Sequence, residues 1–83
     1  MSAPTKPPFA ADFTIDGVGS DWIGVRHAQG HRWRFVVLEK NGRLQLVHDQ
    51  HEAGAGGMEA LAAHAIDAYD TATLEARRRG LVD

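Results

Sequence analysis

Apolar and basic residues alternate along the segment 22–47. In its middle part, Trp33 and Phe35 hold one parity, whereas Arg32 and Arg34 hold the other. Because successive side chains on a β-strand point to opposite faces, this alternation predicts a sheet with two different faces. One face is apolar and suited to a core, and the other is cationic and free to contact a partner.

Three strands joined by two tight turns are predicted, at about 22–28, 32–39 and 43–48. The second turn contains Asn41-Gly42, the strongest short-range hairpin signal, because both positions tolerate a positive φ. The third strand repeats the alternation, with Leu44 and Leu46 opposed to Arg43 and Gln45.

The hydrophobic period changes after a glycine-rich connector at 54–57. Apolar residues then recur at three- and four-residue steps, at Met58, Leu61, Ala62, Ala65, Tyr69, Ala72 and Ala76. This spacing predicts one helix, whose alanine-rich stripe lets it lie close against a sheet. Gly80, directly after three arginines, is typical of a helix C-terminus. The expected fold class is α+β: a three-stranded antiparallel sheet packed against one C-terminal helix, in the order β-β-β-α.

The first twelve residues contain all three prolines and little apolar surface, which predicts a flexible leader over 1–12. A short extra N-terminal strand at Phe13, Ile15 and Val18 is left open, since Gly17 and Gly19 interrupt it. The remainder, 13–83, is expected to form a single small domain.

Overall composition is ordinary, but the distribution of charge is uneven. The chain has 83 residues, a net charge of −2, 43% apolar residues and no cysteine. Disulfides, Cys-ligated zinc and thiol chemistry are excluded, and without a membrane-spanning stretch or a secretion signal a cytoplasmic location is expected. Residues 22–48 nevertheless carry a local excess of +4. This asymmetry predicts a partner for the basic face.

Three short motifs occur in a fixed order within residues 20–80. They are Trp22-Ile23-Gly24-Val25-Arg26, Arg32-Trp33, and Ala68-Tyr69-Asp70-Thr71-Ala72. In this order they resemble the ethylene-response-factor family of plant DNA-binding domains, which has relatives among phage-integrase arm-binding domains. The resemblance implies a three-stranded sheet that lies in the DNA major groove while one helix packs behind it.

The resemblance also implies DNA contacts from Arg26 and Arg43 in the first and third strands. Arg34 shares this face, at a position where the family has a small residue. Three DNA-facing positions depart from the family: Val36 and Leu38 replace polar or basic residues, and Gln45 replaces an aromatic one. The end of the third strand, at 46–49, departs as well.

The leading hypothesis is a non-enzymatic nucleic-acid-binding module, with DNA as its partner, that docks the basic sheet face in a groove. The expected contacts are Arg26, Arg32, Arg34, Arg43 and Gln45. The alternative is a small interaction or regulatory protein, of phage or mobile-element type, that dimerises or binds a protein through the same face. Its expected interface is Val36, Leu38 and Val47, because apolar residues among arginines are typical of protein interfaces.

Candidate chemistry elsewhere in the chain is sparse. His48-x-x-His51 has a spacing seen in metal sites, with Asp49 or Glu52 as possible further ligands. It is interpreted as polar loop sequence, because it lies before the glycines and shows no partner motif. Asp67 and Asp70 are expected on the solvent side of the helix rather than as an acid-base pair. Trp22 is left open between the outer face and the edge of the core. No phosphate-loop or nucleophile motif is recognisable, so we expect no enzymatic activity, cofactor or metal.

Overall fold

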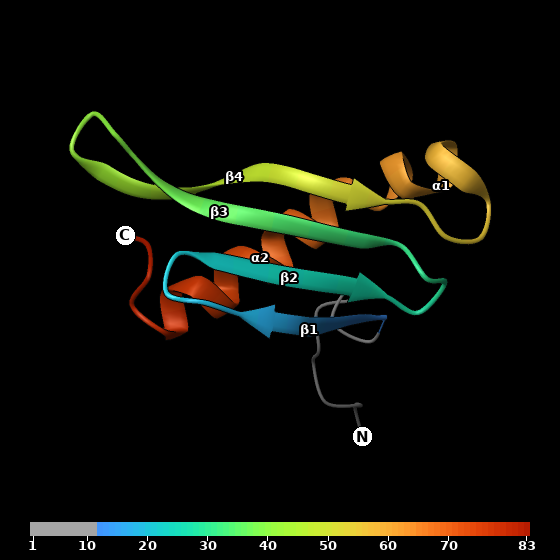
Figure 1. Ribbon diagram of the computed structural model, residues 1–83, viewed down its shortest axis with the longest axis horizontal. Helices are drawn as coiled ribbons and strands as arrows, with labels where there is room; N and C mark the ends of the chain where they lie inside the picture. The colour runs from blue at the N-terminus through green and yellow to red at the C-terminus, as the bar shows by residue number, and fades with distance from the viewer. Residues whose placement is uncertain (1–11) are drawn as a thin grey trace, which may run out of the picture.

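The computed structural model describes residues 12–83, which form four antiparallel strands followed by two helices. The strands are β1 (Phe13–Val18), β2 (Trp22–His27), β3 (Arg32–Lys40) and β4 (Arg43–Glu52), and the helices are α1 (Gly57–Ala63) and α2 (Ala65–Arg78). The sheet order follows the chain, β1-β2-β3-β4, and α2 crosses behind one face (Figure 1). No helix in this part of the chain is long and apolar enough to cross a bilayer. The α+β class with an antiparallel sheet is confirmed, but the sheet has four strands rather than three and the helical part has two helices rather than one.

The fourth strand is β1, which the sequence left open as a short extra strand. It pairs with β2 along its length, from Phe13 opposite His27 to Val18 opposite Ile23. Gly17 does not end the strand, because it lies opposite Gly24, and the irregularity between Ile15 and Gly17 is absorbed as a bulge. The predicted leader at 1–12 lies outside the described residues except for Asp12, whose carbonyl accepts a hydrogen bond from Ala28 N–H at 2.9 Å.

β4 is longer than predicted, because it continues past His48 to Glu52. Phe35 lies opposite His48 and Arg34 lies opposite Gln50, so Asp49 is an extra residue on β4. Such a bulge lets pairing resume after one unpaired residue, whereas strict alternation would place the following side chains on the wrong faces.

The predicted single helix is broken at His64, whose φ of −103° departs from helical geometry. The residues that face the sheet are Leu61, Ala68, Ala72 and Ala76. Met58, expected on the buried stripe, is 55% exposed, and Ala62 is also exposed. Because the helix is interrupted at His64, Met58 and Ala62 do not share the buried face that one continuous helix would have given them.

The core lies between the sheet and α2, and its parity is the predicted one. Trp33 and Phe35 are 4% and 3% exposed. Three alanines of α2 are fully buried, and their small side chains let the helix approach the sheet closely. The ring of Tyr69 packs edge-on against Phe35, and its hydroxyl donates to the carbonyl of Leu46 at 2.9 Å. Tyr69 thus packs on the core side as expected, with its ring partly open to solvent.

The β3–β4 turn is formed by Asn41 and Gly42, with φ of 54° and 78°. Both residues adopt the left-handed backbone conformation, which the tight hairpin turn predicted from the sequence requires. The turn projects beyond the rest of the sheet (Figure 1).

The C-terminal residues return to the outer edge of β4. Leu44 N–H donates to the carboxylate of Asp83 at 2.9 Å, and the backbone N–H of Asp83 donates to the Leu44 carbonyl at 3.2 Å. Together with the Tyr69 hydroxyl on Leu46, these bonds occupy three polar groups of this strand.

Candidate functional site

The sheet face turned away from the helices carries the predicted site residues, and we call it the open face. Cross-strand pairs on this face join Arg26 to Arg32, Trp22 to Val36, Val36 to Val47, and Leu38 to Gln45. Arg34 follows the same parity, with its side chain 46% exposed. The outward orientation of the arginines is therefore confirmed, and the structure brings the residues expected to contact DNA and those of the apolar alternative together on one surface.

Trp22 lies on the open face, which resolves the position that the sequence left open. Its indole covers three glycines, Gly17, Gly19 and Gly24. A Cβ atom built on Gly17 would lie 2.8 Å from the indole Cη2, and one built on Gly19 would overlap the indole nitrogen. These glycines are therefore the seat of an aromatic ring, and two of them are the ones expected to interrupt β1.

Arg34 covers the indole from the solvent side. Its guanidinium carbon lies 4.5 Å from the centroid of the Trp22 ring, a cation–π arrangement. The Arg34 Nε atom also lies 3.9 Å from a carboxylate oxygen of Asp49, the bulge residue of β4. Arg34 is therefore held in place by an aromatic ring and a carboxylate.

Arg32 is paired more tightly than the sequence suggests. Its Nε and Nη2 atoms donate to one carboxylate oxygen of Asp16, at 3.0 and 2.7 Å. Its Nη1 atom lies 3.8 Å from a carboxylate oxygen of Glu52. Two acidic residues outside the 22–48 segment thus offset part of its local positive charge. Asp16 lies 16 positions away in sequence, so spacing alone could not show this pairing.

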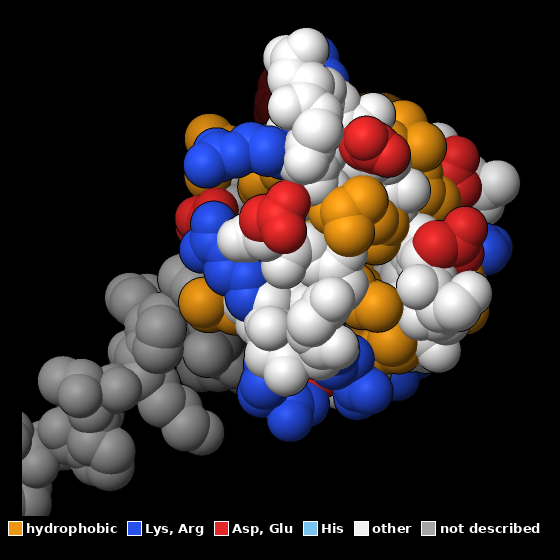
Figure 2. Space-filling view, turned by 90° about the vertical axis from the view of Figure 1, so that its left-hand side faces the viewer, with side chains coloured by type: hydrophobic (Ala, Val, Ile, Leu, Met, Phe, Trp, Pro, Cys, Tyr) orange, Lys and Arg blue, Asp and Glu red, His pale blue; other side chains and the backbone are white. Residues whose placement is uncertain are grey.

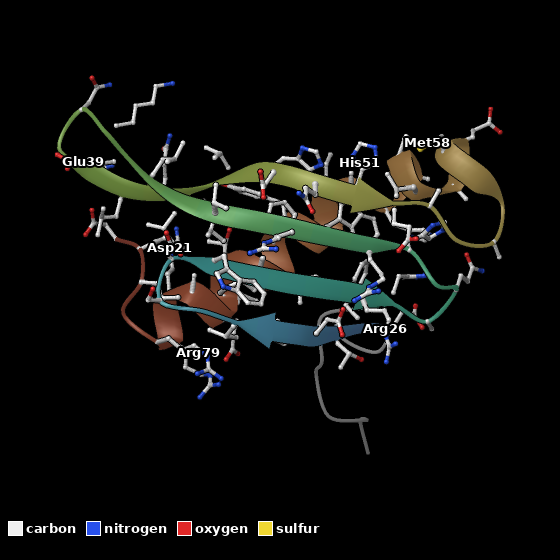
Figure 3. All side chains as sticks on the ribbon, viewed as in Figure 1. Asp21, Arg26, Glu39, His51, Met58 and Arg79 are labelled. Atoms are coloured by element: carbon white, nitrogen blue, oxygen red, sulfur yellow. The ribbon has the colours of Figure 1, made fainter. Side chains whose placement is uncertain are left out.

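Arg26 and Arg43 differ from the other two arginines. Both are exposed, and neither has an ion-pair partner among residues 12–83. Arg26 lies opposite Arg32 near the end of β2, and Arg43 lies opposite Lys40 at the start of β4 (Figure 3 labels Arg26). The two cations therefore stand at opposite ends of the open face.

An apolar row crosses the middle of the open face. Trp22, Val36 and Val47 are successive cross-strand neighbours on β2, β3 and β4, and all three are half-buried. Leu38, two residues further along β3, is 53% exposed. At the end of the molecule near the β3–β4 turn, basic, acidic and apolar side chains are interspersed rather than gathered by sign (Figure 2).

A shallow hollow of about 320 Å³ adjoins this row. It is lined by both charges of the Arg32–Asp16 pair and by the edge of Trp22. Arg32 and Asp16 are hydrogen-bonded to each other, so neither charge of this pair is free for a small ligand.

A cluster of imidazole rings lies on the opposite side of the sheet from the open face. His27 and His64 stack at 4.1 Å between centroids, and His31 lies 5.6 and 5.8 Å from them. His27 and His31 are 4% and 0% exposed. Desolvation by burial, reinforced by the neighbouring His64, lowers the pKa of His27. Sequence reasoning missed this cluster, because His64 is distant from His27 and His31 in sequence and only the fold brings the three rings together.

His48 and His51 lie on β4 and not in a loop. The Asp49 bulge places both rings on the same side of the strand, with His48 Nε2 and His51 Nδ1 2.9 Å apart. Zinc sites need three or four ligands. Among residues 12–83, no group of three or more His, Cys, Asp or Glu side chains is arranged to hold a metal ion.

The charged residues of α2 also form a local network. Arg78 donates to Glu75 through Nε at 3.2 Å and through Nη2, and Arg79 Nε donates to the same carboxylate. These hydrogen bonds lower the pKa of Glu75. Asp70 is exposed, as expected, whereas Asp67 is half-buried, with its carbonyl accepting from Thr71 Oγ1 at 2.8 Å.

Comparison with known proteins gives no further guide to this surface: no protein-family model, no curated protein sequence and no solved structure matches the chain.

Proposed function

We propose that the chain is a non-enzymatic interaction module that binds a protein surface through its open face, the simplest such partner being a second copy of itself. The observation that carries this proposal is the apolar row of Trp22, Val36 and Val47. Tryptophan and arginine are enriched at the energetic centres of protein interfaces, and an apolar centre within a polar rim is the usual anatomy of such interfaces. The cytoplasm, which is the location expected from the sequence, is part of this proposal.

The charges of the open face suit pairing with a copy of the same surface. It carries the carboxylates of Asp16, Asp49 and Glu52 as well as the cations Arg26 and Arg43. A two-fold interface places the same patch on both partners, so a cation of one copy can meet a carboxylate of the other. A face intended only for a polyanion gains nothing from three carboxylates.

Sedimentation equilibrium on the full chain tests this proposal. The wild-type chain is expected to dimerise, and Val36→Asp is expected to weaken dimerisation at least tenfold, because a carboxylate would interrupt the apolar row. Leu38→Asp, at a more exposed position of the same face, is expected to have a smaller effect.

The matched control is Ile66→Asp on α2, which places the same charge on a residue that is 76% exposed. This variant should associate like the wild type. A wild-type chain that stays monomeric at about 100 µM, well above the dissociation constant of a specific dimer, would contradict self-association. Equal effects of Val36→Asp and Ile66→Asp would contradict the assignment of the interface to the open face.

A second candidate is the nucleic-acid-binding module that the resemblance implies. Arg26 and Arg43 favour it, because they are exposed without an ion-pair partner among the described residues and stand on the face that the resemblance assigns to DNA. Arg34 would be the central contact, with Arg32 and Gln45 beside it. Guanidinium groups can bind both phosphate and the guanine edge.

A gel-shift assay with random duplex DNA at low and moderate salt tests this candidate. Phosphate contacts release counterions, so affinity should fall steeply with salt, and Arg34→Ala and Arg43→Ala should weaken binding and flatten that salt dependence. Arg77→Ala, on α2, is the control that should leave binding unchanged. Absence of binding at low salt would exclude this candidate and leave the protein-interaction proposal standing.

A further inference from the structure

The buried imidazole cluster lies on the helix side of the sheet, and the proposed function makes no use of it. Its three rings come from the end of β2, the β2–β3 turn and the junction between α1 and α2. Phe13 closes the cluster, with its ring 4.9 Å from His27. The cluster therefore joins a turn of the sheet to the helical layer.

Two rings of the cluster accept hydrogen bonds from backbone amides. His27 Nδ1 accepts from Gln29 N–H at 3.1 Å, within the β2–β3 turn. His31 Nδ1 accepts from Gly54 N–H at 2.8 Å, in the connector between β4 and α1. A ring nitrogen that accepts carries no proton, so in the neutral state both protons lie on Nε2. His31 Nε2 is buried without a hydrogen-bond partner in the described part of the chain.

A further backbone hydrogen bond joins the turn to the connector. The backbone N–H of Ala55 donates to the Gln29 carbonyl at 2.9 Å. A Cβ atom built on Gly54 would lie 2.5 Å from the Gly30 carbonyl carbon, so only glycine allows this approach without a shift. The contact between turn and connector is thus close. The His31 bond to Gly54 crosses it, and the His27 bond to Gln29 holds the turn that forms one side of it.

An imidazolium has protons on both ring nitrogens and cannot accept at Nδ1. Protonating His27 therefore breaks its hydrogen bond from Gln29 N–H and places a charge beside the buried ring of His31. We propose that this cluster is an acid-sensitive latch, which holds the β2–β3 turn against the β4–α1 connector when neutral and releases it when protonated.

The charged and titratable surroundings favour the neutral state of the latch. From the β2–β3 turn and the helix junction, His31 and His64 face His27 and oppose a positive charge on it. Asp12, before β1, is the one carboxylate with an opposing effect on His27, and it is smaller than desolvation and the effect of His64. Arg26 and Arg32 follow the opposite parity and point to the open face. The lowered pKa of His27 is consistent with a ring that stays neutral until the solution is distinctly acidic.

Amide hydrogen exchange of the full chain, resolved by residue with NMR between pH 8 and pH 5, tests the latch. After correction for intrinsic exchange, the opening equilibrium at the Gln29 amide should rise as the pH falls below the ordinary pKa of histidine, about 6.5, by up to about tenfold per pH unit for the proton taken up by His27. The Gly54 amide should open in the same step, because the latch releases the connector. The amides of Ala72 and Ala76 in α2 report global unfolding, and they should stay protected over the same range. Equal loss of protection at all four amides, or no change at Gln29 and Gly54, would overturn the proposal.

A variant pair isolates the proton from the hydrogen bond. Asparagine places its Oδ1 acceptor at the covalent position of the histidine Nδ1 but does not titrate, so His27→Asn/His31→Asn should keep both amides protected at pH 5. The control, His48→Asn/His51→Asn, removes two exposed histidines and should retain the wild-type pH dependence. Survival of the pH dependence in the first variant, or its loss in the second, would contradict the latch. If the first variant does not fold, the wild-type exchange profile still decides.

Discussion

The guanidinium of Arg34 lies over the indole of Trp22, 4.5 Å from the ring centroid, and the indole in turn rests on glycine backbone. The open face therefore presents an arginine layered on an aromatic ring at its centre. Both groups therefore have packing contacts that an isolated surface side chain lacks. This arrangement predicts that partner recognition depends on the layer as a unit, and that disturbing the seat of the indole affects Arg34 as well.

The seat can be tested by giving its glycines a side chain. Gly19→Ala is expected to displace the indole, because the new Cβ would overlap it, at a cost of about 1–3 kcal/mol in the free energy of unfolding. Gly24→Ala is the matched control, since its Cβ would make only ordinary contact, 3.5 Å from the indole. Urea unfolding measures the stability, and tryptophan emission reports the environment of the ring. Equal behaviour of the two variants would show that the glycine seat is unimportant.

The close approach of α2 to the sheet depends on alanine. Ala72 is fully buried, so Ala72→Leu is expected to push the helix from the sheet and destabilise the fold by about 1–3 kcal/mol or more. Ala62→Leu, at an exposed position of α1, should change stability by less than about 0.5 kcal/mol. Chemical denaturation of both variants measures the difference. A tolerated leucine at position 72 would contradict the packing described above.

Tyr69 contributes through its hydroxyl as well as its ring. Tyr69→Phe removes the hydrogen bond to the Leu46 carbonyl but keeps the contact with Phe35, so a loss of about 0.5–1.5 kcal/mol is expected. Tyr69→Leu removes both and should cost more. The two denaturation midpoints, compared with that of the wild type, separate the hydroxyl from the ring. A phenylalanine variant as stable as the wild type would show that water replaces the bond without loss.

Acid should weaken the C-terminal end of α2. The pKa of Glu75 is lowered in the folded state by its hydrogen bonds to Arg78 and Arg79. The unfolded chain therefore binds this proton more readily than the folded one, so the stabilisation is present above pH 4.5 and is lost as the pH falls through the folded pKa. Thermal unfolding between pH 6 and pH 3 should show a smaller decline for Glu75→Gln than for the wild type. Glu39→Gln, at an exposed position of β3, should decline like the wild type.

Alternation and turn chemistry predicted the central part of the fold. Trp33 and Phe35 are buried and Arg32 and Arg34 are outside because a two-residue period leaves no other arrangement when one face is covered. The left-handed pair at Asn41-Gly42 is likewise a local property of those residues. These predictions depend on short-range geometry alone, and the structure confirms them.

The remaining features depend on contacts that are distant in sequence. Gly17 and Gly19 predict an interrupted strand until the indole of Trp22 is seen to occupy the space they leave. The helix break at His64 cannot be read from a continuous period, since the ring that stacks on it belongs to His27. The same holds for the open face, where Arg32 on β3 pairs with Asp16 on β1, across the intervening strand β2. The sequence therefore predicted which residues share the open face, but not which of its arginines are paired with carboxylates.

The bonds that Asp83 and Tyr69 make to β4 limit how this molecule can grow into larger assemblies. An uncovered outer strand is a template on which a neighbouring chain can add its own strand and extend the sheet without limit. Here part of that template is already occupied from within the chain. A neighbouring strand therefore cannot pair with β4 at residues 44–46 unless these bonds are first broken.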